Sequence, residues 1–216
     1  MKSCRIAILG ATGAVGRTML QVLEEQTDWP IGPVKLLASP RSAGQTLMFK
    51  GQPLTIEAVN EDSFADVDVV LGAVENELAK RWAPVIVKAG AVFVDNSSAF
   101  RLDSDVPLVI PQINPQDIRT HQGIIANPNC ATIIALMAVA PIYRLSRITR
   151  MIVSTYQAVS GAGAAGLAEL KRQITQLEAG KSVTAETFPV QIAYNLIPQI
   201  GGFDEQGYSC LLYTSA

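Results

Sequence analysis

The chain begins with a repeating alternation of short apolar runs and longer amphipathic segments. Residues 4–9 form an apolar run typical of a buried strand, and a glycine-rich turn over residues 10–16 follows it directly. Residues 15–26 carry apolar side chains at helical spacing, and residues 33–39 read as a second buried strand. This order predicts a βαβ unit.

The same alternation continues as far as residue 127. Two apolar stretches, residues 47–49 and 54–59, flank Lys50-Gly51-Gln52-Pro53 as in a short hairpin, which we interpret as a decoration and not as a core element. Further strands and one helix are expected, the strands at residues 67–74, 91–95, 108–110 and 123–127 and the helix at residues 78–89. Strands that alternate with helices predict an α/β fold with a mostly parallel, doubly wound sheet.

The pattern changes after Cys130. Residues 132–143 form an apolar run, and residues 147–159 form a long stretch rich in Ile, Val, Ser, Thr and Tyr, which predicts a strand. A helix is expected over residues 164–178. We interpret this change as the start of a second domain.

The composition is that of an ordinary enzyme and argues against several other classes of protein. The chain has 216 residues, is 49% hydrophobic and 17% charged, and has a net charge of -2, so nothing indicates a nucleic-acid partner. Its longest apolar run is well short of the roughly 20 residues that cross a bilayer, and we expect no membrane segment. The three cysteines are too few and too scattered for a disulfide framework or a zinc site, which indicates a reducing cytoplasm and no metal.

The turn after the first strand reads Gly10-Ala11-Thr12-Gly13-Ala14-Val15-Gly16. Glycines let the backbone approach a ligand closely, and the helix that follows offers its N-terminal amides to a pyrophosphate. The strand before the turn and the helix after it favour a dinucleotide site. The alternative is a turn that needs glycine only because a helix packs closely on a strand.

The end of the second strand indicates which dinucleotide is bound. An acidic residue there usually binds the free ribose 2′-hydroxyl of NAD, but this chain has Ser39-Pro40-Arg41-Ser42. One cation and two hydroxyl groups suit a 2′-phosphate, which favours NADP. The alternative is that Arg41 is an ordinary solvated cation.

Cys130 follows the turn signal Asn127-Pro128-Asn129 and begins an apolar run that is expected to be helical. A helix N-terminus favours the thiolate, which is the nucleophilic form of cysteine. The preceding strand places Cys130 at the carboxyl edge of the sheet, where open α/β sheets bind ligands. A buried structural cysteine is the alternative. The one histidine, His121, precedes the same strand and is expected roughly 20 Å away, too far to act as its base.

Asp95-Asn96-Ser97-Ser98-Ala99-Phe100-Arg101 follows another buried strand, so its polar side chains are expected at the same edge. Arg101 is suited to bind phosphate or carboxylate, but a solvated arginine in a polar turn fits the spacing equally well. Gln157, at the end of an expected strand, and Ser160-Gly161-Ala162-Gly163, before a helix, are weaker candidates.

Five segments taken together resemble the bacterial aspartate-β-semialdehyde dehydrogenases, and the resemblance extends from residue 1 to about residue 209. They are the glycine turn, Arg41-Ser42-Ala43-Gly44, the segment from Asp95 to Arg101, Asn127-Pro128-Asn129-Cys130, and Thr155-Tyr156-Gln157-Ala158-Val159-Ser160-Gly161-Ala162-Gly163. No one of these segments is specific, but their combination in this order is.

The resemblance implies an NADP-dependent enzyme that interconverts aspartyl phosphate and L-aspartate 4-semialdehyde through a cysteine thioester, with inorganic phosphate as co-substrate. Such an enzyme serves lysine, threonine and methionine biosynthesis, and a cytoplasmic homo-oligomer is expected. Cys130 is then the nucleophile, Gln157 orients the substrate, and Arg101 and Asn129 contact the substrate or phosphate. The residues implied to bind NADP are Gly10, Thr12, Gly13, Ala14, Val15, Gly16, Ser39, Arg41, Ser42, Ser160 and Gly161.

The resemblance also suggests how the chain is divided. We expect an NADP-binding Rossmann-like domain over residues 1–128 and part of an α+β catalytic and dimerisation domain over residues 129–209. From Cys210 onward the sequence departs from the family, and residues 210–216 are expected to be a foreign tail. The family's catalytic histidine and substrate-binding basic residues are then missing, and the chain alone is expected to be inactive.

Two other functions remain open. N-acetyl-γ-glutamyl-phosphate reductases resemble this family in fold and in cysteine chemistry, although their usual Asn-Pro-Gly-Cys-Tyr motif differs here at Asn129 and Ala131. A non-catalytic NADP-binding paralogue is the second alternative, and the retention of Cys130 argues against it.

Overall fold

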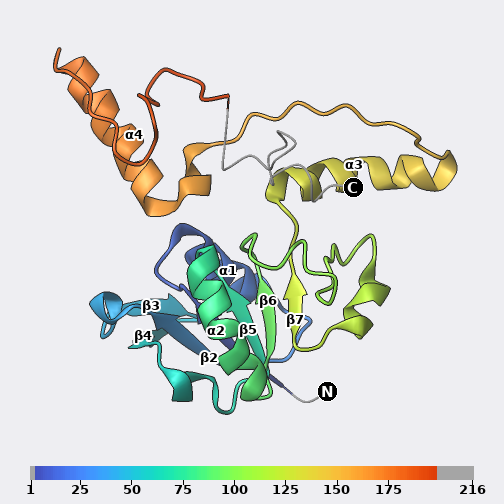
Figure 1. Cartoon of the computed structure of the whole chain (residues 1–216). Coiled ribbons are helices and arrows are strands. Elements are labelled where there is room, and N and C mark those ends of the chain that lie inside the picture. Colours follow the sequence, from blue (N-terminus) through green and yellow to red (C-terminus); the bar gives the residue numbers. More distant parts are fainter. Residues whose placement is uncertain (1–2, 199–216) are drawn as a thin grey trace. The chain divides into compact units, whose positions relative to one another are not determined.

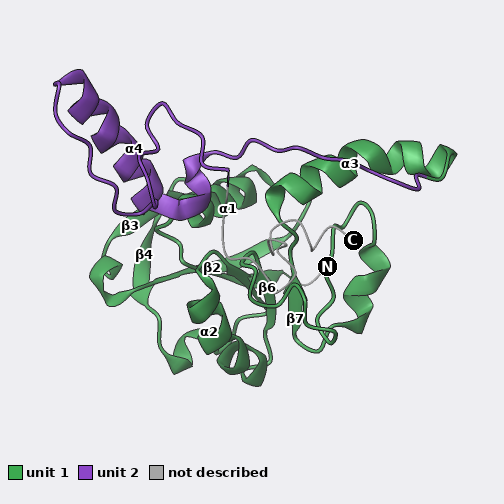
Figure 2. Cartoon of the chain, turned by 45° about the horizontal axis from the view of Figure 1, so that its top comes forward, with its two compact units in different colours: residues 1–147, 214–216 green, residues 148–213 purple. Residues whose placement is uncertain are grey.

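The computed structural model describes residues 3–198. Of these, residues 3–147 belong to one compact unit and residues 148–198 to another (Figure 2). The predicted domain boundary, after residue 128, lies ahead of the last helix of the first unit, and the division into domains stays a prediction. The predicted tail, residues 210–216, lies outside the described residues.

One sheet of seven strands forms the centre of the first unit (Figure 1). In chain order the strands are β1 (Cys4–Leu9), β2 (Ile31–Ala38), β3 (Thr46–Phe49), β4 (Gln52–Ala58), β5 (Val69–Gly72), β6 (Val92–Asp95) and β7 (Ile124–Ala126). Across the sheet the order is β3-β4-β2-β1-β5-β6-β7, and every neighbouring pair is parallel except β3 with β4. The predicted α/β, Rossmann-like sheet is confirmed.

Helices cover both faces of this sheet. The helices of the first unit are α1 (Ala14–Glu25), α2 (Asn76–Lys88) and α3 (Cys130–Leu145), with short 3₁₀ turns η1 (Pro40–Ser42), η2 (Glu61–Phe64) and η3 (Pro115–Thr120). Ile6 and Ile8 of β1 pack in the core that includes Leu20 of α1, whereas Ala7 and Leu9 pack in the core that includes Ile86 of α2. Because alternate strand residues point to opposite faces, a strand buried on both faces is apolar throughout.

The hairpin of β3 and β4 is more than a decoration, so that part of the sequence interpretation was wrong. Leu47 lies opposite Leu54 in the expected antiparallel pair, but β4 also pairs in parallel with β2, Leu36 lying beside Ile56. Ile56 is only 1% exposed. The hairpin therefore extends the main sheet and contributes to its core.

The expected strand over residues 108–110 is reduced to a single bridge between Leu108 and Ala126. This segment lies beside the last strand, β7, but its hydrogen bonds are completed by the side chain of Asn114. The Asn114 amide oxygen accepts from the backbone N–H of Ile110, and its amide nitrogen donates to the carbonyl of Leu108.

The second unit is organised around helix α4 (Gly163–Glu178), which follows the short 3₁₀ turn η4 (Val159–Ala162). The helix was predicted, but the strand predicted over residues 147–159 is wrong for the described structure. Ile152 and Tyr156 are 80% and 85% exposed, and no strand is assigned to residues 148–198. A β-rich stretch needs a partner strand to complete its backbone hydrogen bonds, and the described part of this unit offers none.

Two buried polar side chains of α4 fix the segment that returns along the helix. Gln173 is fully buried; its amide oxygen accepts from the backbone N–H groups of Ile192 and Ala193, and its amide nitrogen donates to Glu169. The Glu169 carboxylate also accepts from the backbone N–H of Thr187. Burying these groups is tolerated because each is hydrogen bonded.

Candidate active site

The sheet has its topological switch point at β1. From β1 the chain builds outward through β2 and β4 on one side, and then returns to add β5, β6 and β7 on the other. In such sheets ligands bind outside the carboxyl ends of the strands at the point where the order reverses. The carboxyl ends of β1 and β5 therefore mark the expected binding crevice.

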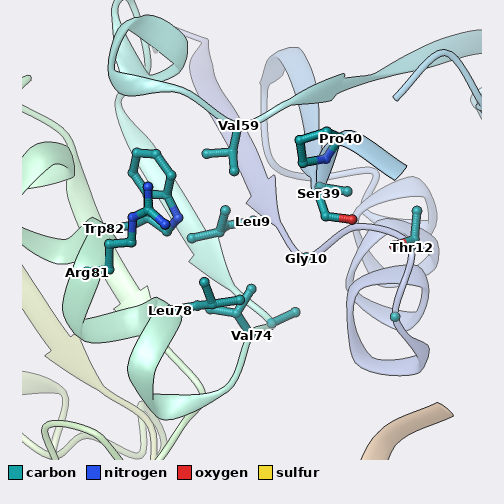
Figure 3. Close-up of a pocket in the computed structure, with 13 residues that line it drawn as sticks. Leu9, Gly10, Thr12, Ser39, Pro40, Val59, Val74, Leu78, Arg81 and Trp82 are labelled. Atoms are coloured by element: carbon teal, nitrogen blue, oxygen red, sulfur yellow. The ribbon is translucent and has the colours of Figure 1, made fainter. Parts of the chain in front are cut away.

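A cavity of about 460 Å³ lies at this point (Figure 3). Four residues that the sequence assigned to the dinucleotide site line it, namely Gly10, Thr12, Gly13 and Ser39. The other lining residues come from the strand ends and from α2; they are Leu9, Ala38, Pro40, Val59, Ala73, Val74, Leu78, Arg81 and Trp82. The cavity and the glycine turn are thus parts of one site.

The three glycines of the turn have different structural roles. A Cβ atom on Gly10, where φ is +89°, would lie 2.3 Å from the carbonyl oxygen of Ala73, and one on Gly16 would lie 2.3 Å from the carbonyl oxygen of Gly10. A Cβ atom on Gly13 would meet only that same Gly10 oxygen, at 3.4 Å, which is ordinary contact. Gly10 and Gly16 are therefore needed for packing, whereas Gly13 lines the cavity without such a packing requirement.

The N-terminus of α1 is suited to bind phosphate. Gly13 is the N-cap residue of this helix, and no side chain caps the helix there. Ala14 and Val15, the first two helical residues, are exposed, whereas Gly16 is buried. Uncapped N-terminal amides together with the helix dipole favour an anion at this end of the cavity.

The segment predicted to bind the 2′-phosphate forms η1 at the end of β2. Ser39 lines the cavity, and its carbonyl accepts from the backbone N–H of Ser42. Arg41 is exposed and does not line the cavity. The sequence interpretation missed Leu78, Arg81 and Trp82, although their i, i+3, i+4 spacing could have shown that one face of α2 carries all three.

Arg101 is held at the carboxyl ends of β6 and β7. Its Nε donates to the carbonyl of Asn127 at 2.9 Å, and a terminal nitrogen donates to the carbonyl of Asn96 at 3.0 Å. The Asn127 side chain also donates to the Asn96 side chain at 2.6 Å. The guanidinium group is therefore fixed between two loops and is not simply a solvated surface cation.

Asp95, the last residue of β6, holds the loop that follows this strand. Its side chain is fully buried and accepts from the hydroxyl of Ser97 at 2.6 Å and from the backbone N–H of Ser97 at 3.1 Å. Burial raises the pKa of the Asp95 carboxyl group, while the Ser97 hydrogen bonds and the charge of Arg101 act in the opposite direction. Asp95 thus shapes the turn that presents Arg101.

Cys130 is the first residue of α3 and is exposed. Asn129 is its N-cap: the side-chain oxygen of Asn129 accepts from the backbone N–H of Ala131 at 3.0 Å. Asn129 is 8% exposed, and its oxygen is already used within the helix cap. Arg101 is hydrogen bonded to the carbonyl of Asn127, which directly follows β7 and lies three residues before Cys130 in the chain.

His121 lies before the amino end of β7, whereas Cys130 follows its carboxyl end, as the sequence indicated. The His121 Nδ1 accepts from the backbone N–H of Gly123 at 2.9 Å. This histidine therefore has a local structural role in the described chain.

The remaining predicted residues belong to the second unit. Gln157 is half-buried in the extended stretch before η4, and Ser160 and Gly161 lie within η4 and are exposed. Their assigned contacts with substrate and NADP stay predictions. Within residues 3–198 no cluster of His, Cys, Asp or Glu side chains is arranged to hold a metal, and no helix is long and apolar enough to span a membrane.

Comparison with known proteins gives consistent matches over almost the whole chain. Curated aspartate-semialdehyde dehydrogenase from Synechocystis is 52% identical over 194 residues, which cover 90% of this chain and 57% of the relative. The crystal structure of aspartate semialdehyde dehydrogenase II from Vibrio cholerae complexed with ASA has a TM-score of 0.94 and 44% identity, covering 100% of this chain and 64% of that one. A more distant structure, from Candida albicans with NADP, has a TM-score of 0.57 and 26% identity, covering 68% and 48%.

The chain therefore spans roughly three fifths of the length of the Synechocystis and Vibrio cholerae relatives. Residues 5–121 match the family described as semialdehyde dehydrogenase, NAD binding domain, and residues 139–211 match the semialdehyde dehydrogenase dimerisation domain. These matches confirm the resemblance seen in the sequence and agree with the glycine turn, cavity and exposed cysteine of the structure. The chain belongs to the semialdehyde dehydrogenase family.

Proposed function

We propose that the whole protein is an aspartate-semialdehyde dehydrogenase that interconverts aspartyl phosphate and L-aspartate 4-semialdehyde, with Cys130 as the nucleophile. The observation that carries this proposal is the exposed cysteine at the start of α3, three residues after the Asn127 carbonyl that holds Arg101. A nucleophilic sulfur and a cation at one sheet edge suit acyl transfer from an acyl phosphate. The names of the relatives supply the substrate class.

NADP is the proposed cofactor, and the residues that line the cavity suit a dinucleotide. The space in front of Gly13 and the uncapped start of α1 suit the pyrophosphate, and Ser39, Arg41 and Ser42 suit a 2′-phosphate. When bound, NADPH supplies the hydride that reduces the acyl group. Ser160 and Gly161 are proposed to contact NADP on the family resemblance alone.

In the biosynthetic direction the Cys130 sulfur attacks the acyl carbon of aspartyl phosphate and forms a thioester, and inorganic phosphate leaves with the electron pair of the broken C–O bond. Arg101 is proposed to stabilise the phosphate as it leaves. Gln157 is proposed to orient the acyl group, and Asn129 to fix the direction of the thiol through the helix cap. The reverse reaction begins with attack of the same sulfur on the aldehyde.

The relatives also bear on the alternatives. The relatives identified by name are aspartate-semialdehyde dehydrogenases, which favours aspartyl over N-acetylglutamyl substrates. A non-catalytic paralogue would not need both an exposed cysteine and a fixed arginine at the carboxyl edge of the sheet. We therefore favour the enzyme.

We propose further that the whole protein is a homo-oligomer of the cytoplasm that acts in lysine, threonine and methionine biosynthesis. The match to a dimerisation domain supports oligomerisation, and so do the exposed apolar side chains of α3: Ile134, Ile142 and Leu145 are 71%, 55% and 90% exposed. A catalytic thiol also favours a reducing compartment.

The test joins this chain to the remaining part of the Synechocystis relative. The joined protein should form NADPH from aspartate semialdehyde only when phosphate is present. Cys130→Ala should abolish this activity, and Cys4→Ala, which changes the thiol within β1, should retain it. Undiminished turnover by Cys130→Ala would refute the mechanism.

The 216-residue chain alone should bind NADP with little turnover. Its one histidine lies at the far end of β7, and loss of a positioned acid or base lowers catalysis by about 10²- to 10⁴-fold. Full turnover by this chain would show that no further catalytic base is needed.

A further inference from the structure

The dinucleotide cavity has an apolar end that the phosphate-binding features do not explain. Figure 3 shows Arg81 and Trp82 across the cavity from Ser39 and Pro40. Val59 also lines this end of the cavity. Apolar surface from Val59, Leu78 and Trp82, together with a guanidinium plane, suits a planar aromatic base better than it suits a phosphate.

One face of α2 forms a platform at this end. Leu78, Arg81 and Trp82 follow the i, i+3, i+4 spacing that places side chains on one face of a helix. The Arg81 guanidinium lies over the Trp82 indole, 5.0 Å from the ring centroid. Trp82 is 6% exposed and contacts the buried ring of Phe64, with the two centroids 5.8 Å apart. The indole is thus fixed by the core, and it holds the arginine in place.

We propose that Arg81, held on Trp82, is the residue that binds the adenine base of the dinucleotide. This inference rests on the proposed function and adds a base-binding residue to it. A guanidinium group is planar and stacks on aromatic faces, so an arginine already lying on indole offers its second face to the base with little loss of side-chain freedom. Trp82 acts as a positioning residue for Arg81.

Two arginines then have separate roles in cofactor binding. Arg41, in η1, is expected to distinguish the 2′-phosphate of NADP from the hydroxyl of NAD. Arg81 is expected to bind the part of the cofactor that NAD and NADP share. Loss of Arg81 should therefore weaken the binding of NADP and of NAD by the same factor, and the ratio of the two dissociation constants should not change.

Isothermal titration calorimetry on the 216-residue chain tests this with NADP and NAD. Arg81→Ala should lower the affinity for each cofactor by about 3- to 30-fold, the range of a cation–π contact at a partly desolvated site. Arg81→Lys keeps the charge but loses the plane and should recover only part of the affinity. Lys80→Ala removes a neighbouring exposed charge of α2 that lies outside the cavity lining, and it should leave both affinities unchanged.

Tryptophan fluorescence supplies a second readout. The chain has two tryptophans, and Trp29 precedes the amino end of β2, so Trp29→Phe leaves Trp82 as the only reporter. NADP should change the Trp82 emission, and adding Arg81→Ala should reduce that change at saturating cofactor.

Loss of cofactor binding and loss of the Arg81 contact have different consequences. Failure of the unmutated chain to bind either cofactor would overturn the proposed function and this inference with it. Normal binding that Arg81→Ala leaves unchanged, or weakens for NADP alone, would overturn the inference and leave the proposed function standing.

Discussion

Gly16→Ala tests the packing of the glycine turn against α1. The added Cβ would lie 2.3 Å from the Gly10 carbonyl oxygen and 2.8 Å from the Ala11 Cα, and both atoms belong to the backbone. Ordinary contact begins near 3.4 Å, so the helix and the turn must separate by about 1 Å. Because backbone in a packed core moves little, we expect a loss of about 3 kcal/mol, the upper end for overpacking by one methyl group.

That loss should lower the melting temperature by about 6–12 °C, since 1 kcal/mol corresponds to about 2–4 °C in a chain of this size. Gly13→Ala is the matched control for folding. Its Cβ has only a 3.4 Å contact, and its φ of -69° suits alanine, so we expect a change below about 1 kcal/mol. The same methyl group should enter the cavity and lower the affinity for NADP about tenfold, which corresponds to the loss of one charge-assisted hydrogen bond to the cofactor.

Circular dichroism melts and calorimetric titration measure the two effects separately. The expected pattern is a destabilised Gly16→Ala and a stable Gly13→Ala that binds NADP weakly. Equal melting temperatures for Gly16→Ala and the unmutated chain would refute the packing argument, and full NADP affinity in Gly13→Ala would refute the position assigned to the phosphates.

Three further predictions concern charge and protonation. Arg41→Ala should lower the affinity for NADP about ten- to a hundred-fold and change the affinity for NAD hardly at all. Equal affinities of the unmutated chain for both cofactors would contradict this. Brief iodoacetamide treatment should label Cys130 before Cys4, because burial raises the pKa of the Cys4 thiol. If mass spectrometry finds Cys4 labelled first, the assignment of Cys130 as the nucleophile is wrong. Burial raises the pKa of Glu169, but hydrogen bonds from Thr187 and its neighbours bring it below the ordinary value of about 4.3. Stability from Glu169 is therefore complete above that pH and is lost as the pH falls through the lower folded-state pKa; amide exchange at Thr187 should show this loss, and Glu169→Gln should remove the pH dependence.

The sequence predicted the sheet because its strands are buried on both faces. Continuous apolar runs such as residues 4–9 can be recognised without knowing their partners, and the glycine turn marks where the first strand ends. Pairing is different, because it depends on residues far apart in the chain. Nothing in residues 54–59 shows that this strand lies beside β2, so the sequence alone indicates only a decorative hairpin.

The same limit explains the run at residues 147–159. Its composition favours a strand, but a strand forms only where another strand accepts and donates its backbone hydrogen bonds, and residues 148–198 contain no such partner. Arg81 and Trp82 were missed for a related reason. On a helix that packs against a sheet they resemble ordinary core and surface residues, and only the fold shows that both face the cavity.

The division of labour among the three turn glycines bears on how such turns change during evolution. Gly10 and Gly16 are required by contacts between backbone segments, so a descendant that no longer bound a nucleotide would still need both to fold. Gly13 has no such packing constraint, and selection on it would relax as soon as the ligand was lost. A sequence that keeps the outer glycines therefore reveals little about its ancestry as a binding protein. Among descendants of this fold, the middle position is the one that records whether a dinucleotide is still in use.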